Sequence, residues 1–144
     1  MQVRDVLKAK GSRVITIDGD ATVTEAVARL VQNNIGSLPV TNGEGRLLGI
    51  FSERDVLRLQ HSRGDGYGRV RVSEVMTPDP VTCDLDDDVN DVMGKMSEKR
   101  IAKVPVLSAD QLVGIVSVGD VIKVMYERVH SENQHLMTYI HGTF

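Results

Sequence analysis

Two short segments of the chain place a serine and an aspartate directly after an apolar stretch. Gly49–Asp55 reads Gly-Ile-Phe-Ser-Glu-Arg-Asp, and Gly114–Asp120 reads Gly-Ile-Val-Ser-Val-Gly-Asp. If each apolar stretch is a strand that leads into a helix, the free amides at the helix start favour a phosphate, and a Ser hydroxyl adds a further group for it. A carboxylate one turn into the helix can accept both hydroxyls of a ribose. The pair of segments therefore predicts two ribose-phosphate sites.

The same Ser-x-x-Asp spacing is also a helix-capping pattern, and for one copy alone capping is the simpler interpretation. Two observations favour a ligand site. Both copies follow an apolar strand that begins with glycine, and both recur with an upstream Pro-Val strand, at Leu38–Val40 and Val104–Val106. One aspartate can serve both purposes, so the sequence leaves capping and binding open together.

The elements that must position these residues also occur twice, with an offset of 66 residues upstream and 65 downstream of a one-residue deletion. A repeat of this length indicates a supersecondary unit used twice. In the first copy the residue patterns predict a strand at 14–17, a helix opened by a Thr22-x-x-Glu25 capping box, strands at 38–40 and 47–51, and a helix from about Ser52. In the second copy they predict a strand at 81–83, a helix capped by Asp88, strands at 104–107 and 112–116, and a helix from about Gly119.

This order predicts an α/β (α+β) fold in which two β-α-β-β-α units form a pseudo-twofold body. The segments that precede the units, 3–7 and 72–76, also match, at an offset of 69. The predicted organisation is a first repeat at 1–60, an inter-repeat loop at 61–71, a second repeat at 72–124 and a C-terminal helical extension at 125–144. The extension carries an apolar stripe that needs a surface to cover it, either its own body or another copy. The polar stretch 130–135 weakens a continuous coiled-coil interpretation.

The composition of the 144 residues, 41% apolar and 26% charged, is typical of one soluble globular domain. A net charge of -3, no tryptophan and 3% aromatic residues give no reason to expect DNA or RNA binding. No apolar run suggests a membrane span, and residues 1–15 lack the pattern of a signal peptide. The single Cys83 cannot form an internal disulfide. We therefore expect a cytoplasmic protein that acts away from membranes.

No metal site or catalytic centre is expected. The acidic cluster around Asp84–Asp91 does not match a calcium loop, because Val89 and Lys95 occupy the positions that need glycine and glutamate. His130 and His135 are five residues apart and do not share a helix face. Cys83 has no neighbouring base, and neither serine has a nearby histidine in the sequence, so an enzyme is not predicted.

Residues 3–124 resemble a tandem pair of CBS domains, named after cystathionine β-synthase and often called a Bateman module. The resemblance rests on the two Gly-x-x-Ser-x-x-Asp segments, the two x-Pro-Val strands and Met76-Thr77-Pro78. It extends to small stand-alone bacterial CBS-pair proteins that end in a helix. It implies a disc-shaped body with clefts that bind AMP, ADP, ATP, S-adenosylmethionine or NAD(H) as a regulatory ligand, with no catalytic cofactor.

The resemblance carries over to particular residues. Asp55 and Asp120 match the ribose-binding aspartate of the family, and Ser52 and Ser117 match its hydroxyl residue near the phosphate. In full, the first predicted site comprises Thr16, Ile17, Gly36, Ser37, Leu38, Pro39, Ser52, Arg54 and Asp55. The second comprises Thr82, Cys83, Ala102, Lys103, Val104, Pro105, Ser117, Val118 and Asp120. Within these sets, Thr16-Ile17 and Thr82-Cys83 match the strand whose backbone reads the adenine edge, and Ser37 and Lys103 match a position that can face the phosphate.

The two copies differ in their charges. Arg54 in the first copy aligns with Gly119 in the second, and Ser37 aligns with Lys103. Each cleft is thus expected to hold one cation, differently placed, and to bind with a different affinity. The function implied is a regulatory, energy-sensing adenine-nucleotide module that acts on a partner protein or through its own assembly, as a homodimer. The alternative is a non-catalytic scaffold with vestigial sites. The sequence leaves open which ligand is physiological, whether both clefts are filled and what is regulated.

Overall fold

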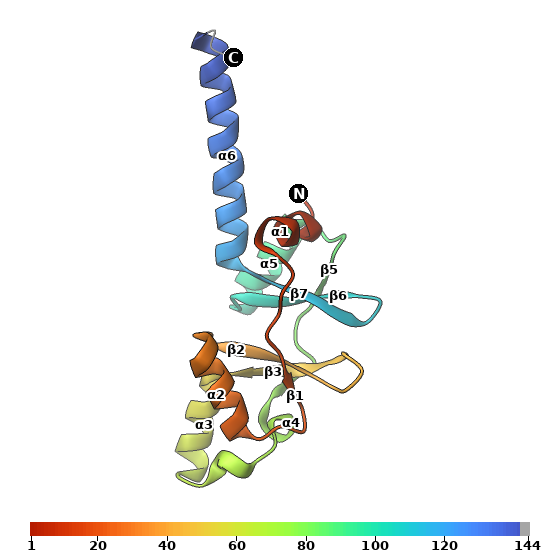
Figure 1. Ribbon diagram of the computed structural model, residues 1–144, viewed down its shortest axis with the longest axis vertical. Helices are drawn as coiled ribbons and strands as arrows, with labels where there is room; N and C mark the ends of the chain where they lie inside the picture. The colour runs from red at the N-terminus through yellow and green to blue at the C-terminus, as the bar shows by residue number, and fades with distance from the viewer. Residues whose placement is uncertain (142–144) are drawn as a thin grey trace.

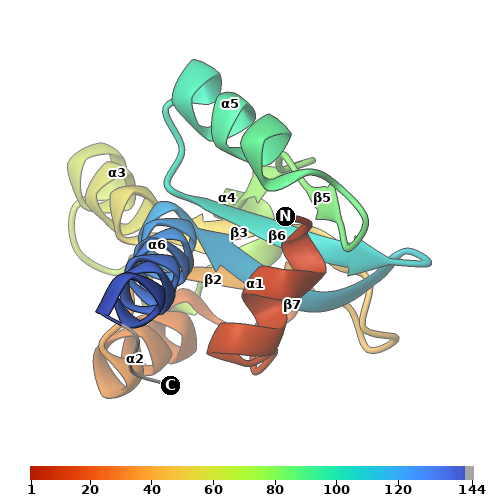
Figure 2. The ribbon, with the colours of Figure 1, turned by 90° about the horizontal axis from the view of Figure 1, so that it is seen from above.

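The computed structural model describes residues 1–141 (Figure 1). Two sheets face each other across the middle of the molecule, and helices cover the outer side of each sheet (Figures 1 and 2). The final helix, α6, extends well beyond this body (Figure 1). The α/β organisation in two repeats predicted from the sequence is confirmed.

The elements follow the predicted order in each repeat, with one additional helix before each. The first part of the chain forms α1 (Val3–Lys10), β1 (Ile17–Asp18), α2 (Val23–Asn33), β2 (Ser37–Thr41), β3 (Leu47–Ser52) and α3 (Glu53–Arg63). The second part forms the 3-10 turn η1 (Tyr67–Arg69), α4 (Val72–Val75), β4 (Thr77–Pro78), β5 (Cys83–Asp84), α5 (Val89–Lys99), β6 (Lys103–Ser108), β7 (Gln111–Ser117) and α6 (Val118–His141). The predicted loop 61–71 thus contains the last turn of α3 and the whole of η1.

The first strand of each repeat begins later than predicted. Strand β1 starts at Ile17 and β5 at Cys83, whereas the apolar patterns predicted starts at residues 14 and 81. Residues 14–16 and 80–82, which precede these strands, are called the crossing segments. They pass from one repeat to the other, as the trace between α1 and β1 shows (Figure 1). Because they cross between layers, they have no neighbouring strand with which to form a ladder.

The two sheets have the strand orders β1-β2-β3-β4 and β5-β6-β7. The first two strands of each sheet are parallel and the next pair is antiparallel, with Leu38 opposite Phe51 and Val104 opposite Val116. All four of these side chains are fully buried. This shared register keeps the apolar face of each hairpin against its own helices, because a shift of one residue would turn those side chains outward.

Each leading helix packs on the opposite repeat. Val3, Val6 and Leu7 of α1 belong to the core built around β6, β7 and α5, whereas Val72 of α4 belongs to the core of the first repeat. Equivalent backbone bonds fix the two helices: the amide of Val3 donates to the carbonyl of Asp87 (3.0 Å), and that of Val72 to Ala21 (2.8 Å). Strand β4, which comes directly after α4 in the chain, also belongs to the first sheet, where it pairs antiparallel with β3.

Local capping explains where the helices start. The Oγ1 of Thr22 accepts the amide of Glu25 (3.2 Å) at the start of α2, as the capping pattern predicted. At α5 the carboxylate of Asp88 accepts the amide of Asn90 (2.7 Å). None of the helices within residues 1–141 combines the length and apolar character needed to cross a bilayer.

Candidate functional site

The repeated Ser-x-x-Asp segments cap the two helices that follow the hairpins. At α6 the amide of Ser117 donates to Oδ2 of Asp120 (2.9 Å), and the amide of Asp120 donates to Oγ of Ser117 (3.0 Å). At α3 the amide and hydroxyl of Ser52 both donate to Oδ2 of Asp55, at 2.8 and 3.2 Å. Capping is therefore present in both copies, and binding has to be judged from what surrounds each carboxylate.

The surroundings of the two aspartates differ. Asp55 is only 5% exposed, and its Oδ1 lies 3.7 Å from NH1 of Arg58 in the next turn of α3. The side chain of Asp120 is 25% exposed and lines a cavity between the repeats. Of the two carboxylates, that of Asp120 is the more accessible to a ligand.

The cavity at Asp120 has a volume of about 310 Å³, within the range of roughly 300–1,000 Å³ typical of small-molecule pockets. We call it the Asp120 cleft. It is lined by residues of both repeats: Lys10, Arg13, Val14, Ile15, Ile35, Ser37 and Pro39 from the first, and Lys103, Ile115, Ser117 and Asp120 from the second. We call its apolar lining residues the apolar wall; its polar lining residues include three basic residues and one acid.

Lys10 makes an ion pair with Asp120 inside this cleft. Its Nζ lies 2.5 Å from Oδ2 of Asp120 and also donates to the carbonyl of Ile115 (2.8 Å). Burial by itself raises the pKa of the Asp120 carboxyl, but the hydrogen bonds from Lys10 and Ser117 outweigh it and hold the pKa below its ordinary value of 3.8. Asp120 is therefore ionised at neutral pH and partnered by an amine that a ligand would have to displace or share.

Lys10 reaches this position because α1 ends beside the outer edge of β7. In the first sheet the corresponding edge is covered by β4, which pairs Thr77 with Ile50 of β3. Within the described residues, β7 has β6 as its only strand neighbour. The repeat aligns Ile115 with Ile50, which pairs with β4 in the first sheet. In the second sheet the Lys10 amine donates a hydrogen bond to the carbonyl of Ile115 instead.

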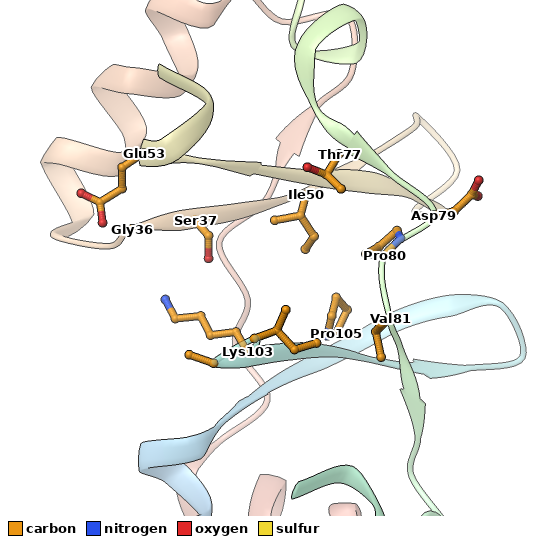
Figure 3. Close-up of a pocket in the computed structure, with 12 residues that line it drawn as sticks. Gly36, Ser37, Ile50, Glu53, Thr77, Asp79, Pro80, Val81, Lys103 and Pro105 are labelled. Carbon is orange, nitrogen blue, oxygen red and sulfur yellow. The ribbon is translucent and has the colours of Figure 1, made fainter. Parts of the chain in front are cut away.

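A second and larger cavity, of about 630 Å³, lies between the two sheets (Figure 3). We call it the Glu53 cleft. It is lined by Gly36, Ser37, Ile50 and Glu53 from the first repeat, and by Thr77, Asp79, Pro80, Val81, Ile101, Ala102, Lys103 and Pro105 from the second. Ile50 projects into it from one sheet, while Pro105 of the other sheet and Val81 lie opposite (Figure 3). A smaller cavity that contains Asp55 adjoins it, because Thr77 lines both.

The two clefts are pseudo-symmetric images of each other. The apolar walls correspond under the sequence repeat: Val14-Ile15 to Pro80-Val81, Ile35 to Ile101, Pro39 to Pro105 and Ile115 to Ile50. Each cleft joins the crossing segment of one repeat to the start of the helix that follows the hairpin of the other. This exchange follows from the position of the leading helices, and it differs from the sequence-based grouping, which kept each aspartate with the crossing segment of its own repeat.

The residues of the first predicted site are dispersed in the structure. Ser37 lines both clefts, Gly36 the Glu53 cleft and Pro39 the Asp120 cleft. Ile17 and Leu38 are buried in the core, the carbonyl of Thr16 accepts NH1 of Arg29 (2.6 Å), and Ser52 caps α3 beside the buried Asp55. Arg54 is exposed and does not line either cleft.

The second predicted site is partly assembled. Ser117 and Asp120 share the Asp120 cleft with Lys103, which also lines the Glu53 cleft together with Ala102 and Pro105. Val104 is fully buried, and Val118 packs against the second core. Thr82 and Cys83 line a separate surface cavity on the far side of β5.

Several lining residues of both clefts were not predicted from the sequence. In the Asp120 cleft they are Lys10, Arg13, Val14, Ile15, Ile35 and Ile115, and in the Glu53 cleft Ile50, Glu53, Thr77, Asp79, Pro80, Val81 and Ile101. One signal pointed to some of them. The offset between the repeats falls from 69 in the leading helices to 66 in the crossing segments, so the first repeat has three additional residues there. These extra residues lengthen α1 and its exit, and Lys10 lies within this stretch.

The acidic cluster stabilises its own loop. Oδ2 of Asp87 accepts the amide of Asp84 (2.8 Å), Oδ1 of Asp84 accepts the amide of Asp86 (3.1 Å), and Asp86 pairs with Arg4. Within residues 1–141 no group of three or more His, Cys, Asp or Glu side chains is placed to hold a metal ion. Cys83 is 5% exposed, and burial, assisted by the charge of Asp87, raises the pKa of its thiol to about 11.

Comparison with known proteins identifies the class. The family model described as the CBS domain matches residues 3–62 and 72–127. The chain is 33% identical to the mitochondrial CBS domain-containing protein CBSX3 of Arabidopsis thaliana, with 99% of this chain and 73% of that protein covered. The protein belongs to the CBS-domain family and is a tandem CBS pair.

Two solved structures are also similar. The CBS-domain-containing protein ATU1752 of Agrobacterium tumefaciens is 35% identical, with a TM-score of 0.80 and coverage of 87% of this chain and 99% of that one. The CBS domain pair of protein MJ0100 is 28% identical, with a TM-score of 0.75 and coverage of 89% and 98%. That pair was crystallised in complex with 5′-methylthioadenosine and S-adenosyl-L-methionine.

Proposed function

We propose that this CBS pair is a regulatory module that binds an adenine nucleotide in the Asp120 cleft. The observation that carries the proposal is the assembly, in one cavity, of an accessible carboxylate, a hydroxyl at the start of a long helix and three basic side chains. That set of groups matches a ribose and a phosphate, and the apolar wall beside it matches a purine ring.

Each group has a defined part in this arrangement. Asp120 accepts the two ribose hydroxyls, as the vicinal diol needs two acceptors and the carboxylate is ionised. Ser117 and the first amides of α6 face the phosphate, with Lys10, Arg13 and Lys103 supplying positive charge. The purine packs between the side chains lining the apolar wall, which come from the crossing segment and β2 on one side and β7 on the other.

Ligand binding is coupled to the body through Lys10. In the structure its amine holds Asp120, and a ribose at that carboxylate competes for the same oxygen. Lys10 is the last residue of α1, which packs against both β7 and α6. A ligand that binds Asp120 therefore displaces the Lys10 amine and releases the C-terminal end of α1. The module then has two arrangements with different ligand affinity, as regulation requires.

The ligand candidates are AMP, ADP, ATP, NAD(H) and S-adenosylmethionine. The complex of the MJ0100 pair with two adenosine derivatives supports the adenosine part of this proposal. The basic residues of the Asp120 cleft favour the members that carry phosphate.

We further infer that the module acts as a homodimer. The outer part of α6 extends away from the body (Figure 1), and Val129, Leu136 and Ile140 on it are 55, 56 and 63% exposed. Together with Ile122 and Tyr126 they follow the alternating three- and four-residue spacing of a coiled-coil seam, with Asn133 at one seam position. A second copy presents the same stripe and is the partner that matches it in length and pattern.

Isothermal titration calorimetry with AMP, ADP, ATP, NAD, NADH, 5′-methylthioadenosine and S-adenosylmethionine tests the ligand proposal. We expect saturable binding of at least one phosphate-bearing ligand, lost or weakened at least tenfold in Asp120→Asn. The matched variant Asp110→Asn changes an exposed carboxylate outside both clefts and should leave the affinity unchanged.

Two results would contradict this function. If none of the seven compounds binds, the sites are vestigial and the protein is an interaction module. If the phosphate-bearing ligand binds equally well to Asp120→Asn, the carboxylate is a helix cap only, and the site assignment is wrong.

A further inference from the structure

The two clefts have opposite charges at matched positions. The repeat aligns Arg13 of the Asp120 cleft with Asp79 of the Glu53 cleft, and Val118 at the start of α6 with Glu53 at the start of α3. The Asp120 cleft is lined by three basic residues and one acid, whereas the Glu53 cleft is lined by two acids and one basic residue. Such a reversal on a duplicated frame changes which ligand charge each cleft accepts.

Glu53 closes the helix start to anions. It is the first residue of α3, and its Oε1 lies against Gly36, only 2.5 Å from where a Cβ atom on that residue would be. The carboxylate thus lies over the residue before β2, beside the start of α3, and its negative charge offsets the positive end of the helix dipole. The neighbouring Asp55 is buried against Ser52 and Arg58, so it adds no accessible acceptor.

The rest of the frame is kept. The prolines and branched aliphatic side chains that form the apolar wall recur in both clefts, with Val81, Ile101 and Pro105 in place of Ile15, Ile35 and Pro39. The apolar parts of the two clefts are therefore alike, and the clefts differ in the charged residues that line them. Glu53 and Asp79 lie toward opposite ends of the cavity (Figure 3), so neither end offers an uncontested anion site.

Lys103 lines both clefts, and its side chain extends toward the side of Ser37 and Gly36 (Figure 3). No ion pair within 4.0 Å links it to Glu53 in the described part of the chain. If the charge of Lys103 is assigned to the Glu53 cleft, the net charge of that cleft is still negative. If it is assigned to the Asp120 cleft, the difference in net charge between the two clefts is larger.

We propose that the two clefts sort adenosine derivatives by charge: the Asp120 cleft takes a phosphate-bearing nucleotide, and the Glu53 cleft takes an adenosine derivative without phosphate, uncharged or positively charged. This inference rests on the proposed function, because it assumes that the shared wall holds the adenine. The two ligand classes then occupy the module together, and its state reports on both.

The test uses three adenosine probes that differ in charge: AMP, 5′-methylthioadenosine and S-adenosylmethionine. Calorimetric titrations of the full chain with each probe are repeated in the presence of a saturating amount of another. We expect one AMP and one 5′-methylthioadenosine to bind at the same time without competition, and S-adenosylmethionine to compete with 5′-methylthioadenosine. Asp120→Asn should lose AMP and retain 5′-methylthioadenosine.

Two reciprocal variants locate the sorting. Arg13→Asp should weaken AMP about tenfold or more, the size expected for reversal of one partly solvated charge beside a phosphate. The double variant Glu53→Val with Asp79→Arg copies the matched residues of the other cleft and should weaken S-adenosylmethionine about tenfold or more, because it removes both acids of the cleft and adds a positive charge. Arg128→Asp and Asp65→Arg change exposed residues that line neither cleft, and they control for the altered net charge.

The outcomes separate the two proposals. Competition between AMP and 5′-methylthioadenosine for one cleft, or a double variant that binds S-adenosylmethionine as tightly as wild type, would overturn the charge sorting while leaving adenine-nucleotide binding in place. Failure of all three probes to bind would overturn the proposed function and the sorting with it.

Discussion

Replacement of Lys10 by methionine removes the ion pair between Lys10 and Asp120 in the Asp120 cleft while keeping the length of the side chain. The side chains of Lys10 and Asp120 are 26 and 25% exposed, so the pair is intermediate between a surface pair, worth about 0–1 kcal/mol, and a well-shielded charged hydrogen bond, worth about 1.5–3 kcal/mol. The carbonyl of Ile115 also loses its donor. We expect a loss of about 1–2 kcal/mol in the free energy of unfolding at pH 7.

The melting temperature should fall accordingly. An unfolding entropy of about 2.1 cal/mol/K per residue gives about 0.3 kcal/mol/K for 144 residues, so the variant should melt about 3–7 °C below wild type. Differential scanning calorimetry and urea unfolding measure both quantities. Lys8→Met, an exposed lysine in the same last turn of α1, is the matched control and should change stability by less than about 0.5 kcal/mol.

The effect should depend on pH in one direction. The pKa of Asp120 is lower in the folded chain than its ordinary value of 3.8, so the unfolded chain takes up this proton first as the pH falls. The stabilisation is complete well above pH 3.8 and is lost as the pH falls through the folded pKa. The difference between wild type and Lys10→Met, measured by urea unfolding, should therefore be constant from pH 7 to about pH 5 and shrink toward pH 3.

A double-mutant cycle decides whether the pair itself is responsible. Lys10→Met, Asp120→Asn and the double variant should show a coupling free energy above about 0.5 kcal/mol at pH 7. If the two single losses simply add, or if the Lys10→Met loss is as large at pH 3 as at pH 7, the ion pair is not what stabilises this corner of the cleft.

Three further predictions concern other parts of the molecule. Cys83, with a thiol pKa of about 11, should resist alkylating reagents at pH 8 in the native protein and react fully in denaturant; rapid native labelling, followed by mass spectrometry, would contradict its burial. Gly49→Ala should destabilise the protein by about 1–3 kcal/mol, because its Cβ would lie 2.5 Å from the carbonyl oxygen of Thr77. Gly94→Ala, with open space around a position in the middle of α5, should instead stabilise the protein by up to about 1 kcal/mol. Thermal unfolding compares the two variants, and equal effects would refute the close approach of β4 to β3. Leu136→Asp should shift the sedimentation coefficient toward that of a monomer, while Gln134→Asp on the same helix should not; a monomeric wild type would rule out pairing through α6.

The repeat made most of the fold predictable from the sequence. Strand and helix patterns located β2, β3, β6 and β7 to within one or two residues, because each hairpin buries a continuous apolar face beside a capped helix. The crossing segments 14–16 and 80–82 were the exception. Their β-branched residues have the composition of a strand, and only the placement of α1 and α4 on opposite repeats shows that they pass between the sheets.

The candidate site was predictable by residue type and less so by grouping. The serine and aspartate at each helix start could be found from the repeat alone, whereas Ser37 and Lys103 were indicated by the resemblance to the CBS family. The partners of Asp120 could not, because Lys10 and Arg13 are more than 100 residues away in the chain and reach it through an exchanged helix. Asp55 shares a cavity with β4, a strand contributed by the other repeat, and no local pattern indicates this neighbour.

The exchanged leading helices have a consequence for how the chain can be divided. Each core takes side chains from both halves of the sequence, so neither repeat contains everything that it needs to fold alone. A chain cut between Gly64 and Gly66, in the exposed turn after α3, would yield two fragments that each hold the missing helix of the other. They should remain associated as complementary halves, and the smallest unit able to fold and evolve independently is the pair.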